Sequence, residues 1–142
     1  MVAMTMLAKD IRPKGPDTEK ITINLGFVDL GHIDLLVQEN FYSNRTDFIR
    51  TAIRNQLDRH AETVQKSVAR NQLDLGLRHF SRQDLETVQA AGERLDIQVL
   101  GLAVIAPDVP PELARGTISS LHILGALQAS PAVKAALSDR MR

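Results

Sequence analysis

The chain has 142 residues, with 17 Lys and Arg against 17 Asp and Glu, and contains neither Cys nor Trp. The lack of cysteine excludes a disulfide framework, a thiol nucleophile and an iron–sulfur cluster. No stretch of about 18 apolar residues occurs, so the sequence predicts neither export nor a membrane span, and we expect a cytoplasmic protein. A net charge of zero gives no sign of a strongly basic surface that would attract nucleic acid.

The composition divides the chain into three predicted parts. Residues 1–18 carry Pro13, Gly15 and Pro16 among basic side chains, which predicts a flexible basic arm. Residues 19–71 have the pattern of one strand followed by helices, and residues 72–142 have the pattern of a small α/β repeat. The expected fold class is therefore α+β.

The second part begins with a strand at residues 20–25, where polar and β-branched apolar residues alternate. A short helix is predicted from an N-cap at Asp29 to a left-handed residue at Asn40. A second helix is predicted from an N-cap at Ser43 to about Arg70, because apolar residues recur there at helical spacing. We expect six apolar side chains to form the core of a dimer: Ile21, Ile23, Leu25, Phe48, Ile49 and Ile53.

A single short strand with two helices cannot bury enough surface to be stable alone. If a second copy supplies an antiparallel strand, the resulting two-stranded ribbon leaves Lys20, Thr22 and Asn24 on its open face. Such a ribbon fits the major groove of DNA. Lys20 can donate to guanine, Asn24 can form two hydrogen bonds with adenine, and Thr22 offers a hydroxyl and a methyl group.

The start of the second helix predicts a phosphate site. Backbone amides near Ser43, Asn44 and Arg45 carry the positive end of the helix dipole, and the Arg45 guanidinium adds a charge. Phosphate contacts fix the register of a protein on DNA, while base contacts read the sequence.

These segments resemble the ribbon-helix-helix domain of the Arc, MetJ and CopG-like bacterial regulators. The resemblance rests on Lys20-Ile21-Thr22-Ile23-Asn24-Leu25 and on the stretch from Phe41-Tyr42-Ser43-Asn44-Arg45 to Arg54. It implies an obligate homodimer that binds double-stranded operator DNA in the nucleoid, through base contacts from the strand and phosphate contacts at the second helix. We therefore expect a sequence-specific transcriptional regulator that acts as a repressor. The sequence departs from many relatives at Asn40, where they have glycine.

The third part repeats a Leu-Gly unit. Leu75-Gly76-Leu77, Leu100-Gly101-Leu102 and Leu124-Gly125-Ala126 follow one another at spacings of 25 and 24 residues. Each unit is predicted to form a buried strand, a turn and a short helix, giving a solenoid-like domain of about three units. Its terminal strands would lack partners, so we expect it to assemble the protein further, into a tetramer or larger.

Other functions have less support in the sequence. No serine lies in a nucleophile-elbow context and no Gly-rich phosphate loop follows a strand, so we expect neither an enzyme nor a cofactor. An antitoxin-type interaction module and a regulator with an effector-sensing carboxy-terminal domain stay open. Nickel-responsive relatives carry a metal-binding domain, but the histidines here are scattered and predict no metal site. These histidines are His32, His60, His79 and His122.

Overall fold

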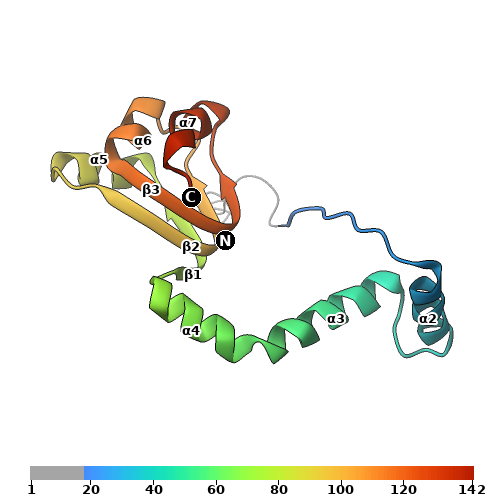
Figure 1. Ribbon diagram of the computed structural model, residues 1–142. Helices are drawn as coiled ribbons and strands as arrows, with labels where there is room; N and C mark the ends of the chain where they lie inside the picture. The colour runs from blue at the N-terminus through green and yellow to red at the C-terminus, as the bar shows by residue number, and fades with distance from the viewer. Residues whose placement is uncertain (1–17) are drawn as a thin grey trace, which may run out of the picture. The chain divides into compact units, whose positions relative to one another are not determined.

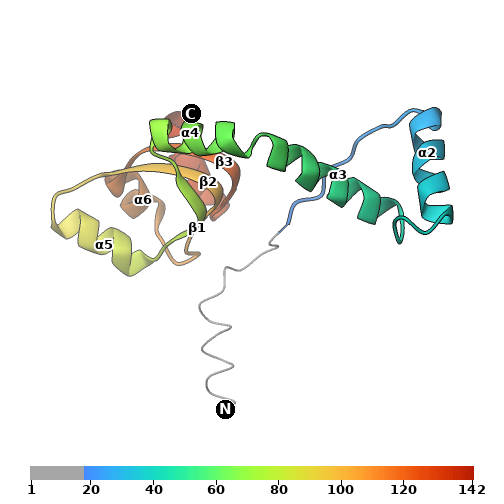
Figure 2. The same ribbon diagram turned by 90° about the horizontal axis from the view of Figure 1, so that it is seen from below.

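The computed structural model describes residues 18–142, which form two compact units (Figures 1 and 2). One unit runs to Ser67 and the other begins at Val68. The described part of the chain is α+β, with six α-helices and one three-stranded parallel sheet. The predicted basic arm lies almost entirely outside the described residues.

The first unit starts with an extended segment, residues 19–26, which pairs with no other described strand. Helix α2 follows over Phe27–Gln38, with Gly26 at its N-cap. The predicted N-cap at Asp29 is therefore wrong: its carboxylate lies in the first turn, where the positive end of the helix dipole favours an acidic side chain. Asn40 has φ 66°, as its place after the helix predicted.

Helix α3 spans Arg45–Arg59, and its N-cap is Asn44 rather than the predicted Ser43. The Asn44 side chain accepts the Asp47 amide, which is the bond that an N-cap provides. The predicted continuation to Arg70 as one helix is also wrong. The helix ends at Arg59 with His60 as its C-cap, and a separate helix α4 spans Ala61–Asn71. The helical spacing of apolar residues continues through this break and therefore did not reveal it.

The second unit alternates strands and helices, and a 3₁₀ turn η1 closes it. Its strands pair in parallel in the order β1-β2-β3. The elements in chain order are β1 Asp74–Phe80, α5 Arg82–Ala90, β2 Leu95–Ile105, α6 Pro111–Thr117, β3 Ile118–Gln128, α7 Pro131–Ala136 and η1 Ser138–Arg140.

Helices α5, α6 and α7 lie along one face of this sheet (Figure 1). Each helix contributes fully buried side chains to a single core, among them Leu85, Ala114 and Val133. Alternate residues of the central strand, including Val99 and Ile105, point into the same core. The unit therefore folds around its own hydrophobic core.

Helix α5 begins with a capping box, which explains why a helix starts directly after β1. The Ser81 hydroxyl accepts the Asp84 amide at 3.0 Å, and the Ser81 amide donates to the Asp84 carboxylate at 2.9 Å. The bond from the Ser81 amide is the main reason that the pKa of Asp84 lies below its ordinary value.

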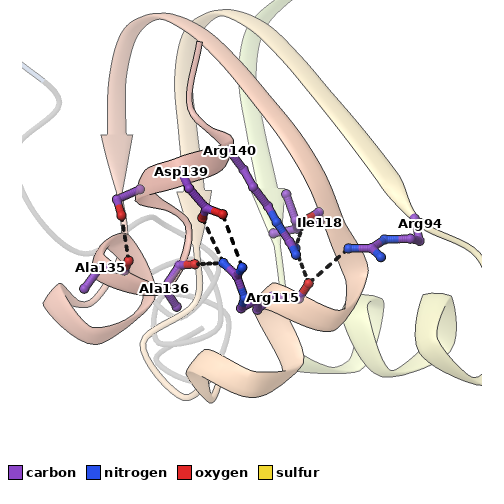
Figure 3. Close-up of polar contacts among 8 residues, drawn as sticks. Arg94, Arg115, Ile118, Ala135, Ala136, Asp139 and Arg140 are labelled. Atoms are coloured by element: carbon purple, nitrogen blue, oxygen red, sulfur yellow. Dashed lines mark hydrogen bonds and ion pairs between the residues drawn. The ribbon is translucent and has the colours of Figure 1, made fainter.

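Arginine side chains connect successive strand–helix units at the carboxyl ends of the helices (Figure 3). Arg94 donates to the Arg115 carbonyl at 3.3 Å, and Arg115 in turn donates to the Ala136 carbonyl at 2.7 Å. Arg115 also forms an ion pair with Asp139 at 2.8 Å, while Arg140 donates to the carbonyls of Arg115 and Ile118. The bonds to the Arg115 and Ala136 carbonyls satisfy helix-end groups that have no partner within their own helix, and the bond to Ile118 reaches the first residue of β3.

The three Leu-Gly units lie in register across the sheet: Gly76 pairs with Gly101, and Gly101 pairs with Gly125. The prediction that these strands are buried is wrong for their leucines, since Leu75 is 71% exposed and Leu124 is 47% exposed. Strand alternation places the leucines on the face that the helices do not cover. The solenoid-like classification stays a prediction.

Candidate nucleic-acid interface

The residues predicted to read bases lie in the extended segment before α2. Lys20, Thr22 and Asn24 are exposed. The apolar residues between them are exposed as well, with Ile21 at 80% and Ile23 at 62%. Side chains alternate between the two sides of an extended chain, so the segment separates a polar side from an apolar side.

The apolar side of this segment continues into an open groove of about 400 Å³. Five of the six predicted dimer-core residues line it, and Ile21 is the exception. The lining consists of Ile23, Leu25, Asp29, His32, Ile33, Phe48, Ile49, Ala52 and Ile53. The sequence pattern did not indicate that Asp29 and His32 line the groove, because these polar residues interrupt the apolar spacing of α2.

Much of this apolar surface stays in contact with water in a single chain. Ile23 is 62% exposed and Ile53 is 53% exposed, whereas Ile33 is buried. Leaving several large apolar side chains hydrated in one place forgoes about 1.5–3 kcal/mol of stabilisation for each. The groove therefore has the composition of half of a hydrophobic core.

The turn before α3 uses two of the predicted phosphate residues to build the helix start. The Ser43 amide donates to the Asp47 carboxylate at 2.9 Å, and the Asn44 side chain accepts the Asp47 amide at 2.8 Å. Tyr42 stacks edge-to-face on Phe48, with ring centroids 5.0 Å apart, which anchors the same turn to α3. The remaining amides of the first turn cannot bond within the helix, so they keep the character of an anion site.

Arg45 forms a two-pronged ion pair with Asp34 of α2. Its Nε and Nη2 atoms each donate to the carboxylate at 2.8 Å, and both side chains are about half exposed. The hydrogen bond from Arg45 lowers the pKa of Asp34, and the bond to Asp34 raises the pKa of Arg45. Asp47, which is two residues from Arg45 in the sequence, binds the Ser43 amide instead.

No group of three or more His, Asp or Glu side chains within residues 18–142 is arranged to hold a metal ion. Within the same residues, no helix is long and apolar enough to cross a membrane.

The comparisons with known proteins agree with this geometry. A sequence model of the ribbon-helix-helix transcriptional regulator family matches residues 16–134, which is most of the chain. The protein therefore belongs to this family of DNA-binding transcriptional regulators. Ribbon-helix-helix regulators bind DNA and usually dimerise, and the family is normally non-enzymatic. A search of curated proteins and a search of solved structures found no match.

Proposed function

We propose that this protein is a sequence-specific repressor whose homodimer inserts an antiparallel β-ribbon into the major groove of an operator. The observation that carries the proposal is the unfilled groove beside residues 19–26. A second copy would pair its own extended segment with this one and fill the groove with its apolar side chains. The dimer core would comprise Ile21, Ile23, Leu25, Phe48, Ile49 and Ile53.

In this ribbon the side chains of Lys20, Thr22 and Asn24 face the DNA from both strands. Each copy then offers one ammonium donor, one hydroxyl with a methyl group, and one amide that can both donate and accept. The amide suits adenine and the ammonium suits the O6 and N7 atoms of guanine. A two-fold dimer reads two half-sites in the same way, so the operator should be close to a palindrome.

The start of α3 supports a phosphate contact that fixes the ribbon in register. The free amides of its first turn and the helix dipole favour an anion there. Arg45 uses Nε and Nη2 on Asp34, and its Nη1 group has further N–H donors for a phosphate oxygen. We assign the phosphate contact to Ser43, Asn44 and Arg45, with Arg45 supplying the charge.

We assign assembly of larger complexes to the second unit. The alternative, an antitoxin-type tail, is an extended segment that folds on its partner. The residues from Val68 onward instead bury a core of their own, with Leu85, Val99 and Ile118 fully enclosed. This observation favours a folded assembly unit.

Selection of bound duplexes from random DNA by the full chain tests the proposed function. We expect enrichment of one motif made of two related half-sites, with a spacing that reports how the ribbons are arranged. Recovery of sequences no different from the unselected pool would contradict sequence-specific binding. The protein's mass in solution, measured on the same sample, gives the number of copies for each bound motif.

A further inference from the structure

The sheet of the second unit has one apolar face that its own helices leave open. Leu75, Leu100 and Leu124 pair across the three strands, and the next outward row is Leu77, Leu102 and Ala126. We call these six residues the leucine face. Leu75, Leu77 and Leu124 are 71%, 53% and 47% exposed, whereas the core under α5, α6 and α7 lies on the opposite side.

An open face is unusual for a sheet of this kind. Parallel sheets occur almost entirely in proteins where both faces are covered, while antiparallel sheets commonly leave one face to water. All the strand pairs here are parallel. A cluster of leucines on such a face therefore indicates a surface that another element covers.

We propose that a second copy of this chain covers the leucine face, with the two sheets packed face to face. The inference rests on the proposed function in one respect: a ribbon that pairs two copies holds their second units at high effective concentration. Tethered domains associate even when the free domains would bind weakly. A second copy is thus the partner most available to this surface.

The chemistry of the face suits an identical partner. Among the outward residues of the three strands, the ionisable side chains are Asp96, which lies at one end, and the histidines His79 and His122. The Asp96 carboxylate accepts bonds from Ser120 and Gln98, so its charge is already partly satisfied. A partner chosen by charge would find little to bind, whereas two leucine faces about 10 Å apart can interdigitate.

The β3 edge of the sheet offers a less accessible route to assembly. At β3, Met141 forms an isolated bridge with Leu121, and the Arg142 amide donates to the Leu121 carbonyl at 2.8 Å. The end of the chain thus occupies part of the edge that an added strand would need. The leucine face carries no such cover among the strands and helices of its own unit.

Cross-linking of the full-length protein tests this proposal. The chain has no cysteine, so Leu100→Cys introduces a single thiol at the centre of the face, on the middle strand. A bifunctional maleimide with a span of about 10 Å matches the spacing of packed sheets. We expect Leu100→Cys to form covalent dimers several-fold faster than the control Gln83→Cys on the exposed surface of α5.

Adding Leu75→Lys and Leu124→Lys to the Leu100→Cys chain should suppress this cross-link, because both lysines would be buried against the second copy. The proposal would be overturned by equal cross-linking at residues 100 and 83, or by a cross-linking yield that the lysines leave unchanged. Either result would fit a leucine face that is covered by another protein or by another segment of the chain. Selection of a DNA motif by the same variants separates the two claims. A motif without cross-linking contradicts only the leucine-face interface, and cross-linking without a motif contradicts only the proposed function.

Discussion

Arg45 has two competing partners in the proposed complex. In the free chain Asp34 holds its guanidinium through two bonds of 2.8 Å, on a surface about half exposed to water. A DNA phosphate at the start of α3 would meet this guanidinium together with a carboxylate of the same sign as the phosphate. Asp34 orients Arg45, and in the proposed complex it would also oppose the binding of DNA.

Replacing Asp34 should show which of these effects is larger. Since exposed ion pairs contribute only about 0–1 kcal/mol, we expect the loss of repulsion to dominate. Asp34→Asn should then tighten binding to specific and scrambled duplexes alike. Arg45→Ala should weaken both and reduce the slope of log affinity against log salt by about one unit. Fluorescence anisotropy at several salt concentrations measures both effects.

Asp58→Asn is the matched control for Asp34→Asn, because it removes the same charge from the exposed surface of α3 far along the helix from Arg45. A smaller gain for Asp58→Asn than for Asp34→Asn is expected. Weaker binding by Asp34→Asn would instead mean that orientation of Arg45 outweighs repulsion. An unchanged salt slope in Arg45→Ala would remove Arg45 from the phosphate contact.

Arg45 could be selected from the sequence because a basic side chain beside a helix start is a local pattern. Its partner could not be selected, since Asp34 lies 11 residues away on another helix. The two meet only because the turn at Asn40 brings α2 and α3 together. The exact N-cap was missed for a related reason: Ser43 and Asn44 are both good caps, and only the bond to the Asp47 amide distinguishes them.

The glycines of the sheet form a row of close backbone contacts. Gly76, Gly101 and Gly125 all have φ between 108° and 137°, which side chains rarely tolerate. A Cβ on Gly101 would overlap the Gly76 carbonyl, and one on Gly125 would overlap the Gly101 carbonyl. A Cβ on Gly76 would meet open space, because β1 is the first strand of the sheet.

Alanine substitutions along this row of glycines should therefore destabilise the second unit by different amounts. We expect Gly76→Ala to lower the free energy of unfolding of the second unit by about 1–3 kcal/mol through backbone strain alone. Gly101→Ala and Gly125→Ala add a clash with backbone, and each should cost more than about 4 kcal/mol. Native-state hydrogen exchange of the β2 amides measures these values within one unit of the protein.

Gly31→Ala provides a control of opposite sign. Gly31 lies inside α2 with nothing within 4 Å of its added Cβ, so alanine should stabilise the helix by about 1 kcal/mol. Equal costs for Gly76→Ala and Gly101→Ala would show that close packing along the row contributes nothing beyond the backbone angles.

The sequence predicted the three Leu-Gly strands better than it predicted which of their side chains are buried. The spacing of 25 and 24 residues identified the three Leu-Gly units in the sequence, and these units pair in register across the sheet. Alternation along a strand identifies residues that share a face. It does not say which face the helices cover, and so Leu75 and Leu124 were expected to be buried. That information depends on the tertiary arrangement of α5, α6 and α7.

At the scale of the whole molecule, each unit has its own part in the proposed function: the first unit binds DNA as a dimer, and the second assembles larger complexes. The first has an apolar groove that a second copy would fill in the proposed dimer, and the second has its own core with one open face. A single sequence suggests the dimer because a short strand cannot be stable alone. The sequence also suggests further assembly through unpaired terminal strands, but it does not indicate the leucine face as an interface, because exposure of the leucines is a property of the folded sheet.

The net charge of the whole chain bears on how the protein would bind DNA. The chain carries 17 basic and 17 acidic residues, so long-range attraction to DNA is weak. Under the proposed function, binding to DNA would then depend on short-range contacts from the ribbon and on repeated attachment through assembly. Specific binding should therefore depend strongly on the side chains at the ribbon surface.

Binding of the Asn24→Ala protein to the selected duplex and to a scrambled duplex tests this claim most directly. We expect a loss of about 1–3 kcal/mol of binding free energy on the selected duplex and no change on the scrambled one, because in the proposed complex Asn24 reads a base and touches no phosphate. An equal loss on both duplexes, or no loss on either, would contradict base reading by the ribbon.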